Sequence, residues 1–164
     1  MEMRILGIDP GLQVCGYACI EMLSDQENLL EAGVVRTVRG EALEEKLNRI
    51  AEDIATLLGR FEPDIVAVEE LYSHYAHPRT AILMGHARGV ILQKCAEAGI
   101  AIESFSATKI KKSLTGNGRA SKEQVQRTIQ TILALAELPE PNDVADAIAA
   151  AMCCGNGLKA AVVR

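Results

Sequence analysis

In the first third of the chain, short apolar runs are separated by turn residues, a pattern typical of strands. The run Ile5–Ile8 ends at Asp9, where a Pro-Gly pair gives strong turn punctuation. Val14–Glu21 alternates loosely between apolar and polar residues, and Ala32–Val38 is rich in valine. We expect these segments to form three strands of an antiparallel meander.

Further along, apolar residues recur at the spacing of an amphipathic helix. The predicted helices are Glu41–Arg60, Pro78–Ala98, a short lysine-bearing helix that begins at Ser106 or Thr108, Ser121–Leu138 and Asp143–Cys154. We expect Pro139 and Gly155 to end the last two. Between the helices, Ile65–Val68 and Ile100–Ile102 are continuous apolar runs, typical of buried parallel strands. The predicted class is α/β, a five-stranded mixed sheet with three antiparallel strands, then two parallel ones, and helices on both faces.

Composition adds limits to this picture. A length of 164 residues suits a single domain over residues 1–164, and with only 3% aromatic residues the core must be aliphatic. No apolar run approaches the ~20 residues of a membrane span. Because the N-terminus lacks a secretory signal and the five cysteines lack zinc-ligand spacing, we expect a cytoplasmic protein with reduced thiols.

The charge distribution is uneven. A net charge of −5 argues against a nucleic-acid-binding protein. However, residues 104–122 contain five basic residues and no acidic ones, which leaves 12 basic and 22 acidic residues elsewhere. A local basic patch matters more for polyanion binding than the net sum.

Carboxylates stand at the ends of predicted strands and on the last helix. Asp9 ends one buried strand and Glu69, beside Glu70, ends another, while Asp143 and Asp146 lie three apart on one helix face. Each acid has an ordinary alternative: a turn aspartate, a solvated strand end or a helix N-terminal acid. The alternative is weakest for Asp146, and the four together favour a site, because ligands collect at the carboxyl ends of parallel strands.

The donor atoms indicate a metal. Convergent carboxylates repel one another, and oxygen ligands without Cys or His select Mg²⁺ or Mn²⁺. Strand alternation does not choose between Glu69 and Glu70.

The element order and four segments together resemble a known group. The segments are Ile5–Gly11 with Gly16-Tyr17, Pro63–Glu70, Gly85–Val90 and Asp143–Ala149. In this order and spacing they resemble the RNase H-like nuclease superfamily and, within it, the RuvC family of bacterial Holliday-junction endonucleases. The resemblance runs from about Arg4 to Cys153.

The resemblance implies the activity and the metal. Asp9, Glu69, Asp143 and Asp146 match the family's catalytic acids, which hold two Mg²⁺, with Mn²⁺ as an alternative. Here the resemblance chooses Glu69 over Glu70, and some relatives carry His at the position of Asp143. The implied reaction is paired nicking of a four-way junction in recombination and repair, leaving 5′-phosphate and 3′-hydroxyl ends.

DNA-binding residues follow in the same way. Tyr72 matches an aromatic residue that stacks at the junction centre, and Lys111 and Lys122 match lysines near the cleaved backbone. Lys122 would neutralise charge on the scissile phosphate. Four basic residues would hold flanking phosphates, unless they form an ordinary solvated face: Lys109, Lys111, Lys112 and Arg119.

The Pro78–Ala98 helix bears on assembly. Its apolar triplets, Ile82–Met84 and Val90–Leu92, cover more than one stripe, and Gly85 and Gly89 permit close backbone approach. Either the helix is wholly buried, or one side packs on a second copy, and a homodimer would place two sites on a two-fold junction. The resemblance also implies a branch-migration motor of the RuvA and RuvB type as a partner.

Two rival functions share the first motif. A YqgF-like RNA-processing nuclease is one, although the Asp143/Asp146 pair and the Tyr72 segment favour RuvC. An actin-like or sugar-kinase ATPase fragment is the other; it would need a second phosphate loop, which the sequence does not contain.

Overall fold

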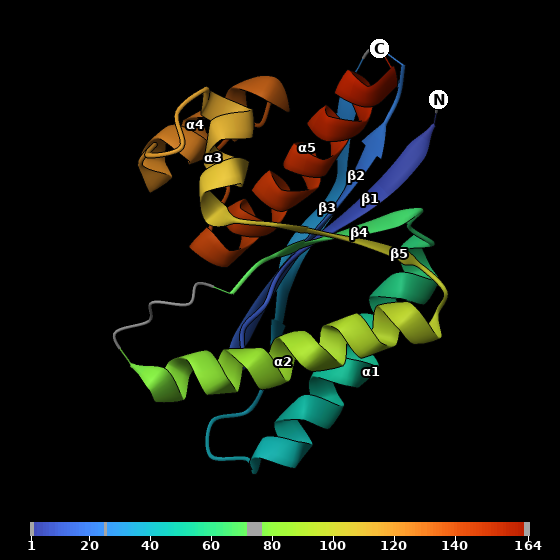
Figure 1. Cartoon of the computed structure of the whole chain (residues 1–164), viewed down its shortest axis with the longest axis vertical. Coiled ribbons are helices and arrows are strands. Elements are labelled where there is room, and N and C mark those ends of the chain that lie inside the picture. The colour runs from blue at the N-terminus through green and yellow to red at the C-terminus, as the bar shows by residue number, and fades with distance from the viewer. Residues whose placement is uncertain (1, 25, 72–76, 163–164) are drawn as a thin grey trace.

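A computed structural model describes residues 2–24, 26–71 and 77–162. Its centre is a five-stranded sheet with the order β3-β2-β1-β4-β5 (Figure 1). The strands are β1 (Met3–Asp9), β2 (Val14–Met22), β3 (Glu27–Arg36), β4 (Ile65–Glu69) and β5 (Ala101–Phe105).

The pairing of the strands confirms the predicted mixed sheet. β2 is antiparallel to both β1 and β3, whereas β4 is parallel to both β1 and β5. β1 therefore joins the antiparallel half to the parallel half. As a result, the carboxyl ends of β1 and β4 stand next to each other at one edge of the sheet.

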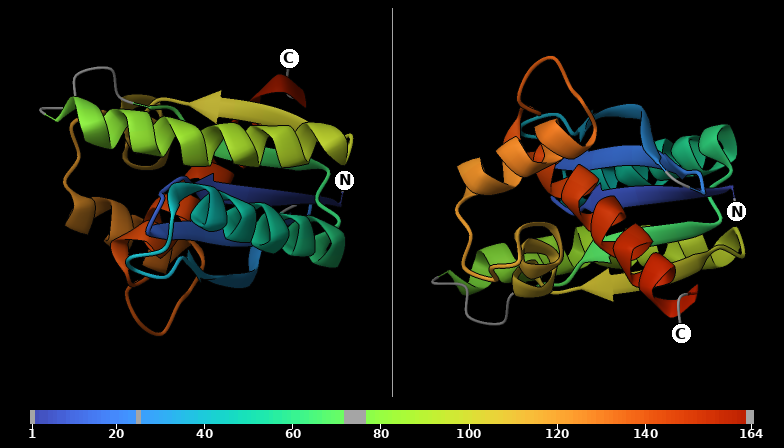
Figure 2. Two further views of the ribbon diagram at one scale, coloured as in Figure 1. Left: turned by 90° about the horizontal axis from the view of Figure 1, so that it is seen from below. Right: turned by 90° about the horizontal axis from the view of Figure 1, so that it is seen from above.

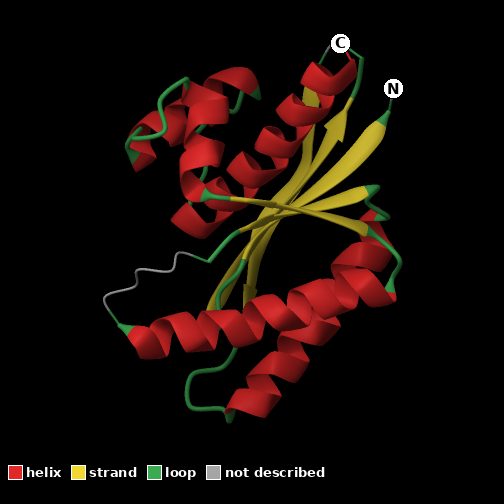
Figure 3. Ribbon diagram, in the orientation of Figure 1, coloured by secondary structure: helices red, strands yellow, loops and turns green. Residues whose placement is uncertain are grey.

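Helices cover both faces, as predicted (Figure 3). The helices are α1 (Leu43–Phe61), α2 (Pro78–Glu97), α3 (Ala107–Thr115), α4 (Lys122–Ile132) and α5 (Asn142–Val162). The pair α1 and α2 packs on one face; α3, α4 and α5 pack on the other, where α5 crosses the sheet diagonally (Figure 2).

Two aliphatic cores result, one on each face. Along β1, Leu6 and Ile8 belong to the core under α1 and α2, whereas Ile5 belongs to the core under α5. This alternation is the period of two that a strand imposes. All five cysteines are free and buried.

Two glycines set how deeply α5 sits on the sheet. A Cβ on Gly7 would stand 2.0 Å from the backbone oxygen of Ala147, and one on Gly16 would stand 1.9 Å from that of Asp143. No side chain fits in either space. The backbone of α5 therefore rests directly on β1 and β2, which brings the start of the helix to the strand ends.

Three predicted boundaries were wrong. β3 begins at Glu27 rather than Ala32, because its pairing with β2 continues to the Met22–Glu27 pair. α4 ends at Ile132 rather than Leu138, where Ala134 adopts a positive φ of 49°. α5 continues through Gly155, where we expected it to end, to Val162.

The two helices α1 and α3 differ in their exposed charges. The helix α1 exposes the acids Glu44, Glu45 and Glu52 together with Arg49 and Arg60. On the other face of the sheet, α3 exposes Lys109 and Lys112 and contains no acid. Within the described ranges, no helix is both long enough and apolar enough to span a membrane.

Candidate metal centre

Asp9 and Glu69 are the last residues of β1 and β4, the two parallel strands at the centre of the sheet. Glu69 is two residues after Ala67, which lies in the core under α5, and Asp9 is two residues after Gly7, which faces α5. By strand alternation, both carboxylates project toward α5. Glu70 has the opposite parity and follows the strand end.

Asp143 and Asp146 come from the first two turns of α5, directly over these strand ends. Both are partly buried, in a helix whose next residues, from Ala147 to Cys154, are almost fully buried. The close contact at Gly16 involves Asp143 itself, so the depth of the helix fixes the position of this acid.

The protonation of Asp9 reflects this crowding. Burial, first, and then the charges of Asp146, Glu69 and Asp143 together raise its pKa to about 8. Lys122 acts against them. Asp9 therefore lies close enough to the other three acids for their charges to act on it.

Glu69 and Asp146 are perturbed in the same direction. Burial, and after it the charge of Asp146, together raise the pKa of Glu69 to about 7. Burial also raises the pKa of Asp146. Lys111 and Lys122 lower both, so the two lysines lie close enough to compensate part of the negative charge.

A cavity of about 220 Å³ joins these acids and lysines. Its lining residues are Glu69, Ala107, Ile110, Lys111, Lys122, Val125, Asp146 and Ala149. Lys122 is the first residue of α4, and a capping box between Ser121 and Gln124 fixes this helix start. The cavity therefore depends on α3, α4, α5 and β4 together.

The basic residues separate into two groups. Lys111 and Lys122 line the cavity, whereas Lys109, Lys112 and Arg119 are exposed outside it. Lys109 holds its ammonium 4.8 Å from the centre of the Phe105 ring. The sequence analysis placed Lys111 both near the cleaved backbone, with Lys122, and among the residues that would hold flanking phosphates; in the structure Lys111 lines the cavity with Lys122. Tyr72 lies outside the described residues.

The donor set suits a hard divalent cation. It consists of carboxylates, and in Asp9, Glu69 and Asp146 burial disfavours the charged form, a penalty that a bound cation would offset. Among the residues that the structure describes, no three Asp, Glu, His or Cys side chains are already gathered closely enough to hold an ion. The acids are neighbours rather than a closed ligand shell.

Cys15 is a neighbour of the acids that sequence reasoning did not include in the site. Burial raises the pKa of its thiol to about 12, and the charges of Asp9 and Asp143 contribute to the rise. A neutral thiol is a poor ligand for Mg²⁺. Cys15 lies in the core under α1 and α2, on the face of the sheet opposite α5, and is not part of the donor set.

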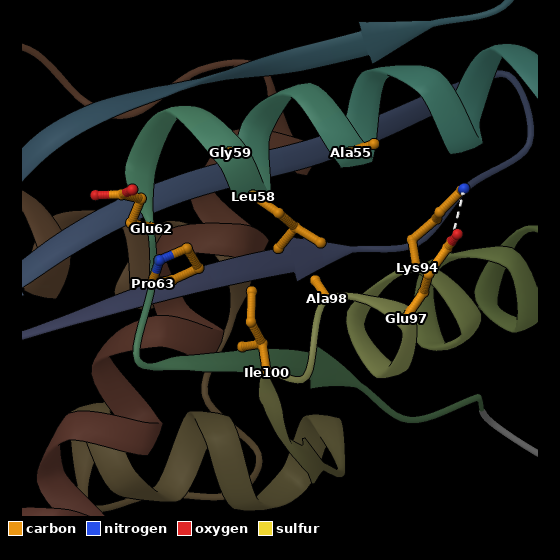
Figure 4. Close-up of a pocket in the computed structure, with 9 residues that line it drawn as sticks. All are labelled: Ala55, Leu58, Gly59, Glu62, Pro63, Lys94, Glu97, Ala98 and Ile100. Atoms are coloured by element: carbon orange, nitrogen blue, oxygen red, sulfur yellow. Dashed lines mark hydrogen bonds and ion pairs between the residues drawn. The ribbon is translucent and has the colours of Figure 1, made fainter.

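A larger cavity, of about 530 Å³, lies elsewhere (Figure 4). It lies between the C-terminal ends of α1 and α2, beside Pro63 and Ile100, which precede β4 and β5. This is the opposite edge of the sheet from the acids. Lys94 and Glu97 form an ion pair of 2.8 Å at its rim. It contains no converging acids, so the chemistry belongs to the smaller cavity.

Comparison with known proteins gives a consistent result. Residues 5–154 match the family model described as crossover junction endodeoxyribonuclease RuvC. A protein of that name from Rhodopirellula baltica is 48% identical over 149 residues, which cover 91% of this chain and 84% of the relative. Another, from Heliobacterium modesticaldum, is 42% identical and is matched over 95% of this chain and 96% of its own length.

A solved structure agrees with the whole fold. Thermus thermophilus RuvC in complex with a Holliday junction substrate superimposes with a TM-score of 0.91 at 33% identity, covering 97% of this chain and 96% of that chain. The similarity therefore includes the sheet, both helical layers and the elements that carry the acids.

Proposed function

The chain belongs to the RuvC family of crossover junction endodeoxyribonucleases, and we propose that Asp9, Glu69, Asp143 and Asp146 form the metal centre of its reaction. Its function is the resolution of Holliday junctions in recombination and repair, by metal-dependent nicking of two strands. One observation carries the assignment of the site: the four acids are coupled electrostatically at the ends of β1 and β4, beside two lysines.

We propose two Mg²⁺ ions, with Mn²⁺ as a substitute, as the cofactors. When bound, such a pair lowers the pKa of an attacking water and stabilises the leaving 3′ oxygen. The carboxylates of the chain would hold the ions and release their protons on binding. Lys111 and Lys122, which face the same cavity, would neutralise the scissile phosphate and hold it over the acids.

The DNA path continues over exposed basic residues. Lys109, Lys112 and Arg119 surround the cavity on the surface of α3 and the loop after it, and would hold flanking phosphates. We keep the proposal that Tyr72 stacks on a base at the junction centre, since it follows Glu69 by three residues. The helix α1 lies on the other face of the sheet and would turn away from DNA.

We also propose a homodimer formed through α2. The helix buries Ala87, Ile91 and Cys95 against the sheet but leaves Ile82 62% exposed. A Cβ on Gly89 would meet no atom within 4 Å, so the fold of one chain does not require glycine there. Two copies would place one site on each of the two nicked strands of a symmetric junction.

Two proposals rest on family membership alone. We propose a partnership with a branch-migration motor of the RuvA and RuvB type, which co-purification with those proteins on junction DNA would test. We propose the cytoplasm as the compartment, where the buried thiols would remain reduced.

A synthetic four-way junction tests the site. Asp146→Asn should abolish cleavage in Mg²⁺ while gel-shift affinity in chelator stays within about threefold, because the acids hold metal and the lysines hold DNA. Glu70→Gln, on the opposite side of the strand end, is the matched control and should cleave normally. Full cleavage by Asp146→Asn would reject the proposed metal centre. A structured RNA substrate tests the YqgF-type alternative, and we expect it to stay intact.

A further inference from the structure

Arg88 links α2 to the strand end that carries Glu69. Its Nη2 donates to the Ser104 hydroxyl on β5 at 2.9 Å, and its Nε lies 3.4 Å from the backbone carbonyl of Glu69, to which it donates a long hydrogen bond. Arg88 is partly buried in the middle of α2. One side chain therefore touches two adjacent strands at the level of the metal centre.

The end of β4 needs such a contact. Its pairing with β1 stops at the Ile8–Val68 pair, one residue before Glu69, so only β5 continues the ladder on the other side. The next backbone bond, from the Glu70 amide to the Phe105 carbonyl, also goes to β5. A strand end paired on one side opens locally at low cost.

The electrostatics of Arg88 are unusual for a purely structural residue. The ion pairs among the described residues do not include it, and its two acceptors are a neutral hydroxyl and a neutral carbonyl. Partial burial of a guanidinium without a carboxylate partner costs free energy. Its hydrogen bonds to the Ser104 hydroxyl and the Glu69 carbonyl are the contacts that offset part of this cost.

We propose that Arg88 is a positioning residue that fixes Glu69 for metal binding by clamping the end of β4 to β5. This inference rests on the proposed function. It assigns no contact with metal or DNA to Arg88, which acts from the face of the sheet opposite α5. Its planar group donates in two fixed directions and can reach both acceptors, which a lysine ammonium cannot do.

Metal affinity of the folded protein is the direct measurement. We would titrate Mn²⁺ into the full chain and into Arg88→Met, Arg88→Lys and Ser104→Ala, using calorimetry without DNA. Loss of a residue that orients a metal ligand costs about 10–100-fold in affinity, and we expect about tenfold weaker Mn²⁺ binding for both Arg88 variants. Arg49→Met, on the exposed side of α1, is the matched control and should bind as the parent does.

Three further readouts separate positioning from stability or charge. Half-saturating Mg²⁺ for junction cleavage should rise by a similar factor in Arg88→Met, whereas junction affinity in chelator should not change. The effects of Arg88→Met and Ser104→Ala on Mn²⁺ affinity should be non-additive, because they break one shared contact. Arg88→Lys should not restore affinity; full restoration would mean that charge alone matters and would overturn the clamp.

The outcomes distinguish the two proposals. If the parent binds Mn²⁺ and Arg88→Met binds it equally well, even with a lowered melting temperature, then Arg88 is only structural and the inference fails. If the parent binds no Mn²⁺, the proposed metal centre fails, and the role of Arg88 fails with it.

Discussion

Without metal, the protein should lose stability as the pH rises from 6 to 8. The folded state holds protons on Asp9 and Glu69 that the unfolded chain releases near pH 4, because burial raises the two pKa values to about 8 and about 7. The stabilisation from these bound protons is complete below about pH 4 and is lost as the pH rises through 7 and 8.

The magnitude follows from the two pKa values. Between pH 6 and 8, Asp9 alone should cost roughly 2 kcal/mol and Glu69 roughly 1 kcal/mol, and their mutual coupling makes the combined loss roughly 2–3 kcal/mol. For a chain of this length, 1 kcal/mol corresponds to a shift in melting temperature of about 2–4 °C. We expect the melting temperature in chelator to fall by roughly 5–10 °C.

Thermal unfolding at pH 6 and pH 8, with chelator or with Mg²⁺, measures this loss. Asp9→Asn replaces the most perturbed group by a neutral one and should lose more than half of the pH dependence; comparing it with the parent cancels contributions from other groups. Mg²⁺ should raise the melting temperature of the parent more at pH 8 than at pH 6, since binding displaces fewer protons there. An identical pH dependence in the parent and Asp9→Asn would refute the reasoning.

Three further predictions concern the helices. Gly16→Ala would force a methyl group on β2 against the backbone of Asp143 in α5. It should lower the free energy of unfolding by about 1–3 kcal/mol in chemical denaturation and remove most of the cleavage rate. The control Gly157→Ala, at a position of α5 with open space, should fold and cleave normally. Replacing Lys109 and Lys112 by Glu should weaken binding to all junction sequences about equally. In gel shifts, it should lower the slope of log affinity against log salt by about 2. An unchanged slope would place the DNA elsewhere. Gly89→Leu should yield folded monomers by sedimentation, with a melting temperature that no longer depends on protein concentration, and a persistent dimer would rule out α2 as its interface.

The local pattern of apolar and polar residues predicted the strands and the helix that carry the four acids. Short apolar runs that end in an acid are visible in the sequence, which is why Asp9 and Glu69 could be assigned to neighbouring strand ends. Strand parity alone left Glu70 open. The observed register resolves the geometry, because it places Ala67 under α5 and therefore directs Glu69 to the same side.

The end of α5 and the positions of Arg88 and Lys111 depend on contacts between residues far apart in the sequence, so the sequence pattern could not predict them. The helix α5 continues through Gly155 because this residue packs where a Cβ would stand 2.8 Å from the Met22 sulfur, so burial outweighs the low helix propensity of glycine. Arg88 gave no signal of its role, since its acceptors lie 16 and 19 residues away. The inward direction of Lys111 depends on how α3 docks against α5, which no local pattern encodes.

The lysines of α3, a helix that contains no acid, give one face of the molecule a local positive field, although the whole chain has a net charge of −5. Farther than a Debye length from DNA, salt screens this net charge. Within about a Debye length, ~8–10 Å at physiological salt, the field of the duplex varies across the protein and exerts a torque that turns the basic layer inward. Encounters through the face that carries α3 are thus favoured over encounters through other faces. Selectivity in this protein begins during approach, ahead of any contact between its acids and a phosphate.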